Sequence, residues 1–96
     1  MRTMITCRLP VESGNKAIKD GSLPVVIQAT LEKIKPECAY FYVENGRRTM
    51  RAVFDFKSEK DMVPLFEPLM LQLGADLELT PVMTAQDLQA GFKELG

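Results

Sequence analysis

The chain has 96 residues, of which 46% are hydrophobic and 26% charged, and its formal net charge is −1. This length suits one domain over residues 1–96, and the composition is that of a folded protein rather than a disordered chain. The near-zero net charge gives no global field that would attract nucleic acid. The sequence also contains no apolar run of about 18 residues, which a membrane-spanning helix would need. The chain starts without an apolar signal segment, so we expect it to reside in the cytoplasm.

Two cysteines and no histidine narrow the chemistry further. Cys7 and Cys38 are far apart, and each falls on a predicted strand, so we expect both to be reduced packing residues. Without histidine, Ser-His-Asp and Cys-His nucleophile systems are excluded. Most zinc and non-haem iron sites also lack their usual ligand. The sequence therefore predicts no metal and no cofactor.

The first third of the chain predicts a strand followed by an interrupted helical stretch from Val11 to Pro36. Alternation over residues 2–9 indicates the strand, which ends at Pro10. A short polar helix over residues 15–20 ends at Gly21, because glycine readily adopts the left-handed conformation at a helix end. A second helix then begins with Ser22 as its N-cap, tolerates Pro24 in its first turn and stops at Pro36.

The most informative stretch runs from Tyr40 to Phe56. Two alternating runs flank Asn45-Gly46, and this pair is the strongest short-range signal for a β-hairpin. One face of the hairpin is apolar. The other face is polar and aromatic, so it must meet water, a ligand or another subunit.

The next segment predicts a helix that contains a proline. Ser58 is the expected N-cap, with Asp61 near the third helical position. Pro68 would leave the carbonyl of Pro64 without its helical donor, which predicts a kink or a late helix start. Gly74 supplies the C-cap.

A fourth strand over residues 75–83 and a final helix complete the chain. Thr84 caps this helix, with Asp87 at its third position, and its apolar positions are Leu88, Phe92 and Leu95. The order β-α-β-β-α-β with an extra C-terminal helix predicts an α+β, ferredoxin-like fold. Right-handed crossovers place the first strand between the third and fourth, and both main helices cover one face of a four-stranded antiparallel sheet.

The strand alternation then assigns residues to the two faces of the sheet. The helix-facing set is Ile5, Cys7, Leu9, Phe41, Val43, Met50, Ala52, Phe54, Phe56, Leu77 and Leu79. The opposite set is Met4, Thr6, Arg8, Tyr40, Tyr42, Thr49, Arg51, Val53, Glu78, Thr80 and Val82.

The second face is too apolar to leave in water as one patch, so we expect a second copy of the chain to cover it. Two such sheets could enclose a small, partly polar cavity. Arg8 and Arg51 fall on neighbouring strands, and two buried guanidinium groups would be costly without anions. Glu78 and Asp55 could supply those anions within the protein. A carboxylate or phosphate of a ligand could supply them instead.

The predicted ligand-binding residues are therefore Arg8, Tyr40, Tyr42, Arg51 and Glu78. Each also has a plainer interpretation: the arginines as partners of structural ion pairs, the tyrosines as interface or core aromatics. A catalytic alternative uses Tyr40, Tyr42, Glu78 or Glu67 as acid–base groups.

Several segments resemble a known group of proteins. The segments are Pro36–Phe41, Gly46–Thr49, Glu67–Leu69, and Pro81–Met83 followed by Asp87-Leu88. They look like an uncharacterised bacterial family of about this length in the dimeric α+β barrel superfamily, and the resemblance covers the chain from about Leu9 to Phe92. It implies a homodimer in which two sheets form a barrel-like enclosure.

Some other members of that superfamily are cofactor-independent monooxygenases or muconolactone-isomerase-like enzymes, and others bind haem, usually through a histidine that this chain lacks. The resemblance carries no catalytic residue onto this sequence. Tyr40, Arg47, Arg48 and Glu67 occupy family-motif positions whose role it does not specify.

Three hypotheses follow. The first is a homodimer that binds a small organic molecule, either anionic or neutral, between its sheets. The second is a cofactor-independent oxygenase or isomerase. The third is a structural or regulatory dimer without a ligand. None of them involves nucleic acid or a membrane.

Overall fold

A computed structural model describes residues 1–96. It contains four strands, four α-helices and one short 3₁₀ turn, and it is an α+β structure. The elements in chain order are β1 (Arg2–Arg8), α1 (Val11–Asp20), α2 (Ser22–Ile34), β2 (Cys38–Glu44), β3 (Arg47–Asp55), η1 (Glu59–Asp61), α3 (Met62–Leu73), β4 (Asp76–Pro81) and α4 (Ala85–Glu94).

The four strands form one antiparallel sheet in the order β2-β3-β1-β4. The prediction that β1 lies between β3 and β4 is confirmed. The hairpin between β2 and β3 is also confirmed. Asn45 and Gly46 have φ angles of 51° and 77°, and positive φ at both turn positions is what a two-residue hairpin of matching twist requires.

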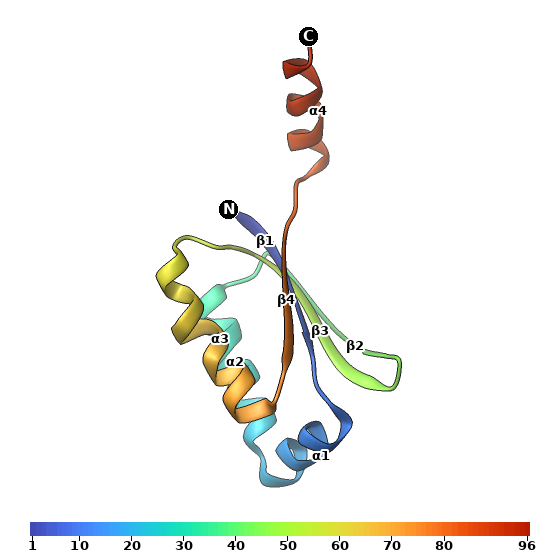
Figure 1. The fold of residues 1–96 in the computed structure, drawn as a ribbon, viewed down its shortest axis with the longest axis vertical. Helices are drawn as coiled ribbons and strands as arrows, with labels where there is room; N and C mark the ends of the chain where they lie inside the picture. Colours follow the sequence, from blue (N-terminus) through green and yellow to red (C-terminus); the bar gives the residue numbers. More distant parts are fainter.

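The helices α1, α2 and α3 lie on one side of the sheet, with α2 and α3 next to each other and α1 at the end where β1 leaves the sheet (Figure 1). The core forms between this layer and the sheet. Its least exposed large side chains are Ile5 and Phe54 from the strands and Leu69 and Leu73 from α3. The strand register places Ile5 opposite Ala52 and Leu79, as the alternation predicts.

The predicted helical stretch from Val11 to Pro36, interrupted at Gly21, is confirmed, but the start of its first helix and the cap of its second are wrong. Helix α1 begins at Val11 rather than Asn15, because the Pro10 carbonyl already accepts the Gly14 N–H at 2.9 Å. Ser22 does not cap α2. Gly21, with a φ of 79°, ends α1 as predicted and also precedes α2 directly. The Ser22 N–H is therefore satisfied by the Asp20 carboxylate at 2.8 Å.

Helix α3 accommodates its internal proline without interruption. The predicted Ser58 cap makes no side-chain hydrogen bond, and a 3₁₀ turn precedes the late start at Met62. Pro68 lies inside the helix and cannot donate to the Pro64 carbonyl. The Lys33 ammonium, from α2, donates to that carbonyl at 3.3 Å. Gly74, with a φ of 62°, ends the helix as predicted.

Helix α4 forms as predicted but stands away from the body. Thr84 and Asp87 form a capping box, with each side chain bonded to the other's backbone N–H at 3.0 and 3.1 Å. No residue of α4 is buried, and Leu88, Phe92 and Leu95 are 40%, 54% and 84% exposed. The helix extends past the end of β4, which helps give the molecule its length of 55 Å against 30 and 17 Å in the other directions (Figure 1).

The face assignment of β2 is correct, but the prediction that its helix-facing side chains are covered is wrong. Phe41 and Val43 lie on the helix side, yet they are 57% and 70% exposed. Strand β2 is an edge strand, and the helix layer makes its contacts with the sheet elsewhere.

Strand β4 is shorter than predicted, covering Asp76–Pro81. No helix is both long and apolar enough to cross a membrane.

Candidate functional site

The sheet face opposite α1, α2 and α3, which we call the open face, brings most of the predicted site residues together. The register places Tyr40, Arg51, Thr6 and Glu78 in one row across all four strands. The adjacent row contains Tyr42, Thr49, Arg8 and Asp76. All five predicted ligand-binding residues therefore lie in two neighbouring rows.

A network of ion pairs connects these rows. Arg8 donates from Nε to Glu44 Oε2 at 2.7 Å and from Nη1 to Glu78 Oε1 at 3.0 Å. Arg51 donates from Nε to Thr6 Oγ1 at 3.2 Å and from Nη2 to Glu44 Oε1 at 3.5 Å. Glu44 is thus the acceptor that the two arginines share, and strands β1 to β4 all contribute to one network.

The two predicted tyrosines differ in their surroundings. The Tyr42 hydroxyl contacts Glu44 Oε1 at 3.5 Å, and its ring lies 5.8 Å from the Arg51 guanidinium carbon, within the range of a cation–π contact. Tyr40 is paired with Arg51 across the strands but is 68% exposed. The structure therefore joins Tyr42 to the network and leaves Tyr40 at its solvent edge.

The ion pairs hold these groups in their charged forms. The hydrogen bond from Arg8 is the main cause that lowers the pKa of the Glu44 carboxyl below its usual range. The hydrogen bonds to Glu44 and Glu78 raise the pKa of Arg8 above its already high value. Glu44 is therefore a stable anion at neutral pH, suited to positioning cations and unsuited to accepting a proton.

The sequence prediction omitted Glu44 from the site, although a signal for it was available. Glu44 has the same parity as Tyr40 and Tyr42 along β2, so the alternation alone places it on the open face. The expectation that Asp55 balances Arg8 or Arg51 is wrong. Asp55 lies opposite Arg2 in the register of β3 and β1, at the other end of the sheet. Its carboxylate accepts a hydrogen bond from the Met1 amino group at 2.9 Å.

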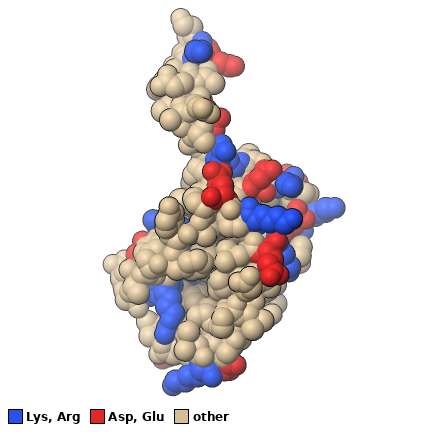
Figure 2. All heavy atoms as spheres, turned by 180° about the vertical axis from the view of Figure 1, so that it is seen from behind, with Lys and Arg blue, Asp and Glu red and all other residues tan.

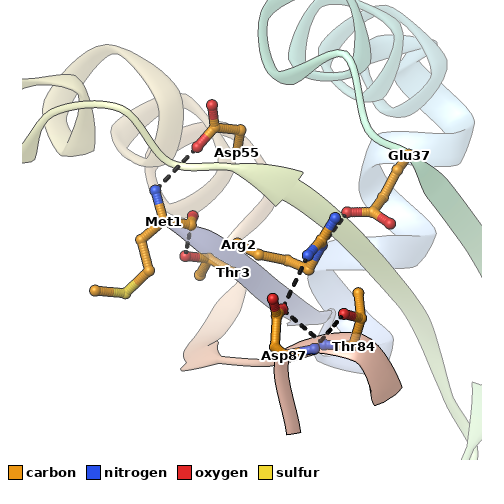
Figure 3. Close-up of polar contacts among 7 residues, drawn as sticks. All are labelled: Met1, Arg2, Thr3, Glu37, Asp55, Thr84 and Asp87. Atoms are coloured by element: carbon orange, nitrogen blue, oxygen red, sulfur yellow. Dashed lines mark hydrogen bonds and ion pairs between the residues drawn. The ribbon is translucent and has the colours of Figure 1, made fainter. Parts of the chain in front are cut away.

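A second polar cluster holds the base of α4 against the body (Figure 3). Arg2 donates from Nε to Glu37 Oε1 at 2.6 Å and from Nη1 to Asp87 Oδ2 at 3.3 Å. It thereby connects β1, the loop before β2 and the first turn of α4. Figure 2 shows acidic and basic side chains next to each other at the narrow neck below α4, while most of the helix surface above it is uncharged.

Three of the four motif positions of unspecified role donate and accept no side-chain hydrogen bond in the open-face network, although Arg47 lies opposite Glu44 in the register of β2 and β3. Arg47 is exposed beside the hairpin turn. Arg48 faces the helix layer and donates to the Asn15 side chain at 3.1 Å, and a Cβ on Gly14 would lie only 2.7 Å from its Nη1. Glu67 is exposed on α3, on the helix side of the sheet. Glu67 and Tyr42, two of the acid–base candidates, thus lie in different layers of the molecule.

An apolar groove of about 510 Å³ opens on the helix side, between α1, α2 and the hairpin. Nine of its twelve lining residues are hydrophobic. The residues that define it are Ile18 from α1, Leu23 and Ile27 from α2, Phe41 and Val43 from β2, and Met50 from β3. The alternation along β2 did not predict this groove, because it assigns Phe41 and Val43 to the face that the helices cover.

Both cysteines are free thiols. Cys7 is buried, and this burial is the main cause that raises its pKa to about 11, so it remains a protonated thiol near neutral pH. Cys38 is partly exposed and lies on the open face, opposite Val53 in the register of β2 and β3. No group of three or more His, Cys, Asp or Glu side chains is arranged to hold a metal ion.

A scan of the sequence against protein-family models found no match, and a search of curated proteins found no significant match.

Proposed function

We propose that the protein is a homodimer with a ferredoxin-like fold of the dimeric α+β barrel type, and that its two open faces enclose a site for a small anionic organic molecule. The strand order β2-β3-β1-β4, with the three helices of the body on one face, supports this fold. The resemblance in the sequence supports the same assembly. In this arrangement each copy covers the sheet face that its own helices leave bare.

The composition of the open face supports its coverage by another copy. Arg8 and Arg51 are balanced by Glu44 and Glu78, so covering this network would bury no net charge. Around it lie aliphatic side chains such as Met4 and Val53. A neutral network with an apolar surround is compatible with an interface between two identical surfaces.

Arg51 is the observation that carries the ligand proposal. Its Nη2 contact with Glu44, at 3.5 Å, is at the outer limit of a hydrogen bond, and 40% of its side-chain surface is exposed. Arg8 by contrast holds two carboxylates at 2.7 and 3.0 Å. If a second sheet excludes water, the remaining Arg51 donors need an acceptor. A ligand carboxylate or phosphate would supply it, with Tyr42 and Tyr40 beside it.

The test measures assembly and ligand response together. Light scattering should report a dimer at micromolar concentration. Inorganic phosphate and a panel of mono- and dicarboxylates should include at least one compound that raises the melting temperature, because a ligand at about 100 times its Kd adds about 2.7 kcal/mol to stability. Arg51→Gln should abolish that response. Lys16→Gln, which removes one positive charge at an exposed position of α1, should retain it.

A ligand-free structural dimer is the second candidate, and the internal charge balance of the network favours it. It predicts that the wild type and Arg51→Gln form equally stable dimers and that no anion raises the melting temperature of either. A monomer at every concentration would contradict both candidates.

A further inference from the structure

We propose that the free edge of β2 pairs antiparallel with the same edge of a second copy of the chain, so that two sheets join into one across a twofold axis at Phe41. This contact is separate from the proposed open-face dimer and does not depend on it. Its surface is the outer edge of Cys38–Glu44, and its partner is the identical strand.

The direction of the backbone groups of β3 follows from two hydrogen bonds at its ends. The Arg48 carbonyl accepts from the Leu9 N–H at 3.0 Å, so Arg48 faces β1. The Val53 carbonyl accepts from the Glu37 N–H at 2.8 Å, so Val53 faces the opposite side, where β2 lies. Because successive residues of a strand direct these groups to opposite sides, the odd-numbered residues of β3 face β2.

The same alternation leaves a row of backbone groups on β2 without a partner. Tyr40, Tyr42 and Glu44 lie opposite the odd-numbered residues of β3, so they exchange hydrogen bonds with them. Ala39 and the two other odd-numbered residues of β2 therefore direct their N–H and C=O groups out of the sheet. No strand lies on that side, because β2 is at the edge. Such a row is a template on which a further strand can pair.

The two edges of the sheet differ in the features that discourage pairing. Strand β4, at the other edge, carries Asp76 and Glu78 and ends in Pro81. Charges and proline are among the features that keep natural edge strands from pairing with other chains. Strand β2 contains no proline, and its one charged residue is Glu44, at its end. The edge of β2 is therefore the one that is open to a further strand.

The edge of β2 is self-complementary about its central residue. In an antiparallel pair centred on Phe41, this residue lies opposite Phe41 of the second copy, and Ala39 lies opposite Val43. These are the residues whose backbone groups point outward, so the pairing forms about six hydrogen bonds. Glu44 lies opposite Cys38, and no like charges meet. An identical strand thus satisfies the free backbone groups without electrostatic conflict.

The side chains at this edge favour the same partner. Phe41 and Val43 lie on the helix side but are 57% and 70% exposed, because the helix layer contacts the sheet elsewhere. The second copy keeps its helices on the same side of the joined sheet, and the uncovered strand leaves room for them. Aromatic and β-branched side chains that face one another across antiparallel strands stabilise the pair. The pairing therefore covers apolar surface that a single chain leaves in water.

Register-specific disulfide formation tests the pairing directly. Ala39→Cys and Val43→Cys are each made with Cys38→Ser, because Cys38 is a partly exposed free thiol. In the proposed register, the Cα atoms of position 39 in one copy and position 43 in the other are about 5.5 Å apart, within the range of a disulfide. Two copies of position 39, or two of position 43, are about 14 Å apart, because they are four residues out of register.

A mixture of the two variants should therefore form a covalent dimer under mild oxidation at least about tenfold faster than either variant alone. Mass spectrometry identifies the mixed species. Both positions lie on the helix side of the sheet, so contact between open faces does not produce this link. If the mixture cross-links no faster than the separate variants, the pairing is overturned.

The strength of association gives a second test. Phe41→Lys places two like charges opposite each other at the axis and should weaken the edge contact at least about tenfold. Leu71→Lys introduces the same charge at an exposed apolar position of α3 and should change it by less than about threefold. Analytical ultracentrifugation measures both, and circular dichroism confirms that each variant is folded. Equal association for the two variants would contradict the pairing.

A variant of the open face separates this inference from the proposed dimer. With both contacts the wild type forms a closed tetramer at high concentration, and Val53→Asp and Phe41→Lys should each reduce it to a dimer. Association that is lost only with Phe41→Lys would retain the edge pairing and overturn the open-face dimer. Association that is lost only with Val53→Asp would do the opposite. A wild type that is monomeric at every concentration would overturn both.

Discussion

The two faces of the single sheet satisfy their side chains in different ways. The helix-covered face buries Ile5, Phe54 and Leu69 within one chain, and only at the edge strand β2 do apolar side chains of this face, Phe41 and Val43, remain exposed. The open face holds a polar network that is balanced in charge but incompletely hydrogen-bonded at Arg51. The comparison teaches that apolar burial sets the fold, whereas the second face carries groups whose full satisfaction requires something outside the chain.

The two cysteines provide the largest contrast between the faces. At protein concentrations where the chain is monomeric, iodoacetamide should modify Cys38 at least about 10³-fold faster than Cys7. Cys7 is buried under the helices and reacts only through global opening, which costs at least about 5 kcal/mol in a typical domain. Mass spectrometry of labelled peptides measures both rates. Equal rates would show that the helix-covered face is not closed.

The same experiment sharpens the comparison at higher protein concentration. Because Cys38 lies on the open face, the proposed sheet contact should slow its modification as the protein becomes dimeric, while the rate for Cys7 stays low. A Cys38 rate that is independent of concentration in a demonstrated dimer would place the interface elsewhere.

A substitution in the core should have the largest effect on stability. Leu69 is fully buried in α3, and Leu69→Ala should lower the free energy of unfolding by about 2–5 kcal/mol through lost burial and a cavity. Urea denaturation measures the change. Leu71→Ala, at an exposed position of the same helix, is the matched control and should change stability by less than about 0.5 kcal/mol.

Substitutions in the open-face network should have smaller effects, and these should follow the number of contacts. Glu44→Gln removes the charge that Arg8 and Arg51 share, whereas Glu78→Gln removes a partner of Arg8 alone. The urea midpoint should therefore fall more for Glu44→Gln than for Glu78→Gln, and for both less than for Leu69→Ala. A larger loss for Glu78→Gln would contradict the central position of Glu44.

Acidification should produce the smallest and most gradual change. The folded-state pKa of Glu44 is lowered by Arg8, so its contribution to stability is present above the unfolded value of about 4.3 and is lost as the pH falls through the folded value. Stability should thus decline below about pH 4.3, with a shallower decline in Glu44→Gln. Urea midpoints measured from neutral to acidic pH give the slope of stability against pH. Identical slopes for the wild type and Glu44→Gln would show that the Arg8–Glu44 pair does not contribute to stability.

The elements that the sequence predicted correctly are those with strong local causes. Asn45-Gly46 adopts the backbone angles of a hairpin turn, and Thr84 with Asp87 forms a capping box, because each signal involves only a few adjacent residues. The position of β1 between β3 and β4 followed from the order of elements and the handedness of crossovers.

The errors arose where contacts depend on distance along a strand or on the placement of a helix. Alternation gives the face of Asp55 but not its row, and the register puts Asp55 opposite Arg2 rather than beside Arg8. Periodicity likewise marks Phe41 and Val43 as apolar positions without saying whether a helix reaches the edge strand. Arg8, Arg51 and Glu78 of the network were predicted from the sequence, whereas Glu44 was not, because alternation gives its face but not its contacts with both arginines.

The hydrogen bond from Lys33 to the Pro64 carbonyl has an evolutionary consequence. Pro68 deprives one turn of α3 of its usual backbone donor, and a side chain from the adjacent helix replaces it. Among homologous sequences, positions 33 and 68 should therefore covary. In homologues without proline at position 68, the backbone N–H can donate to the carbonyl of residue 64, so position 33 should vary. Homologues that keep Pro68 should retain a long cationic side chain at position 33.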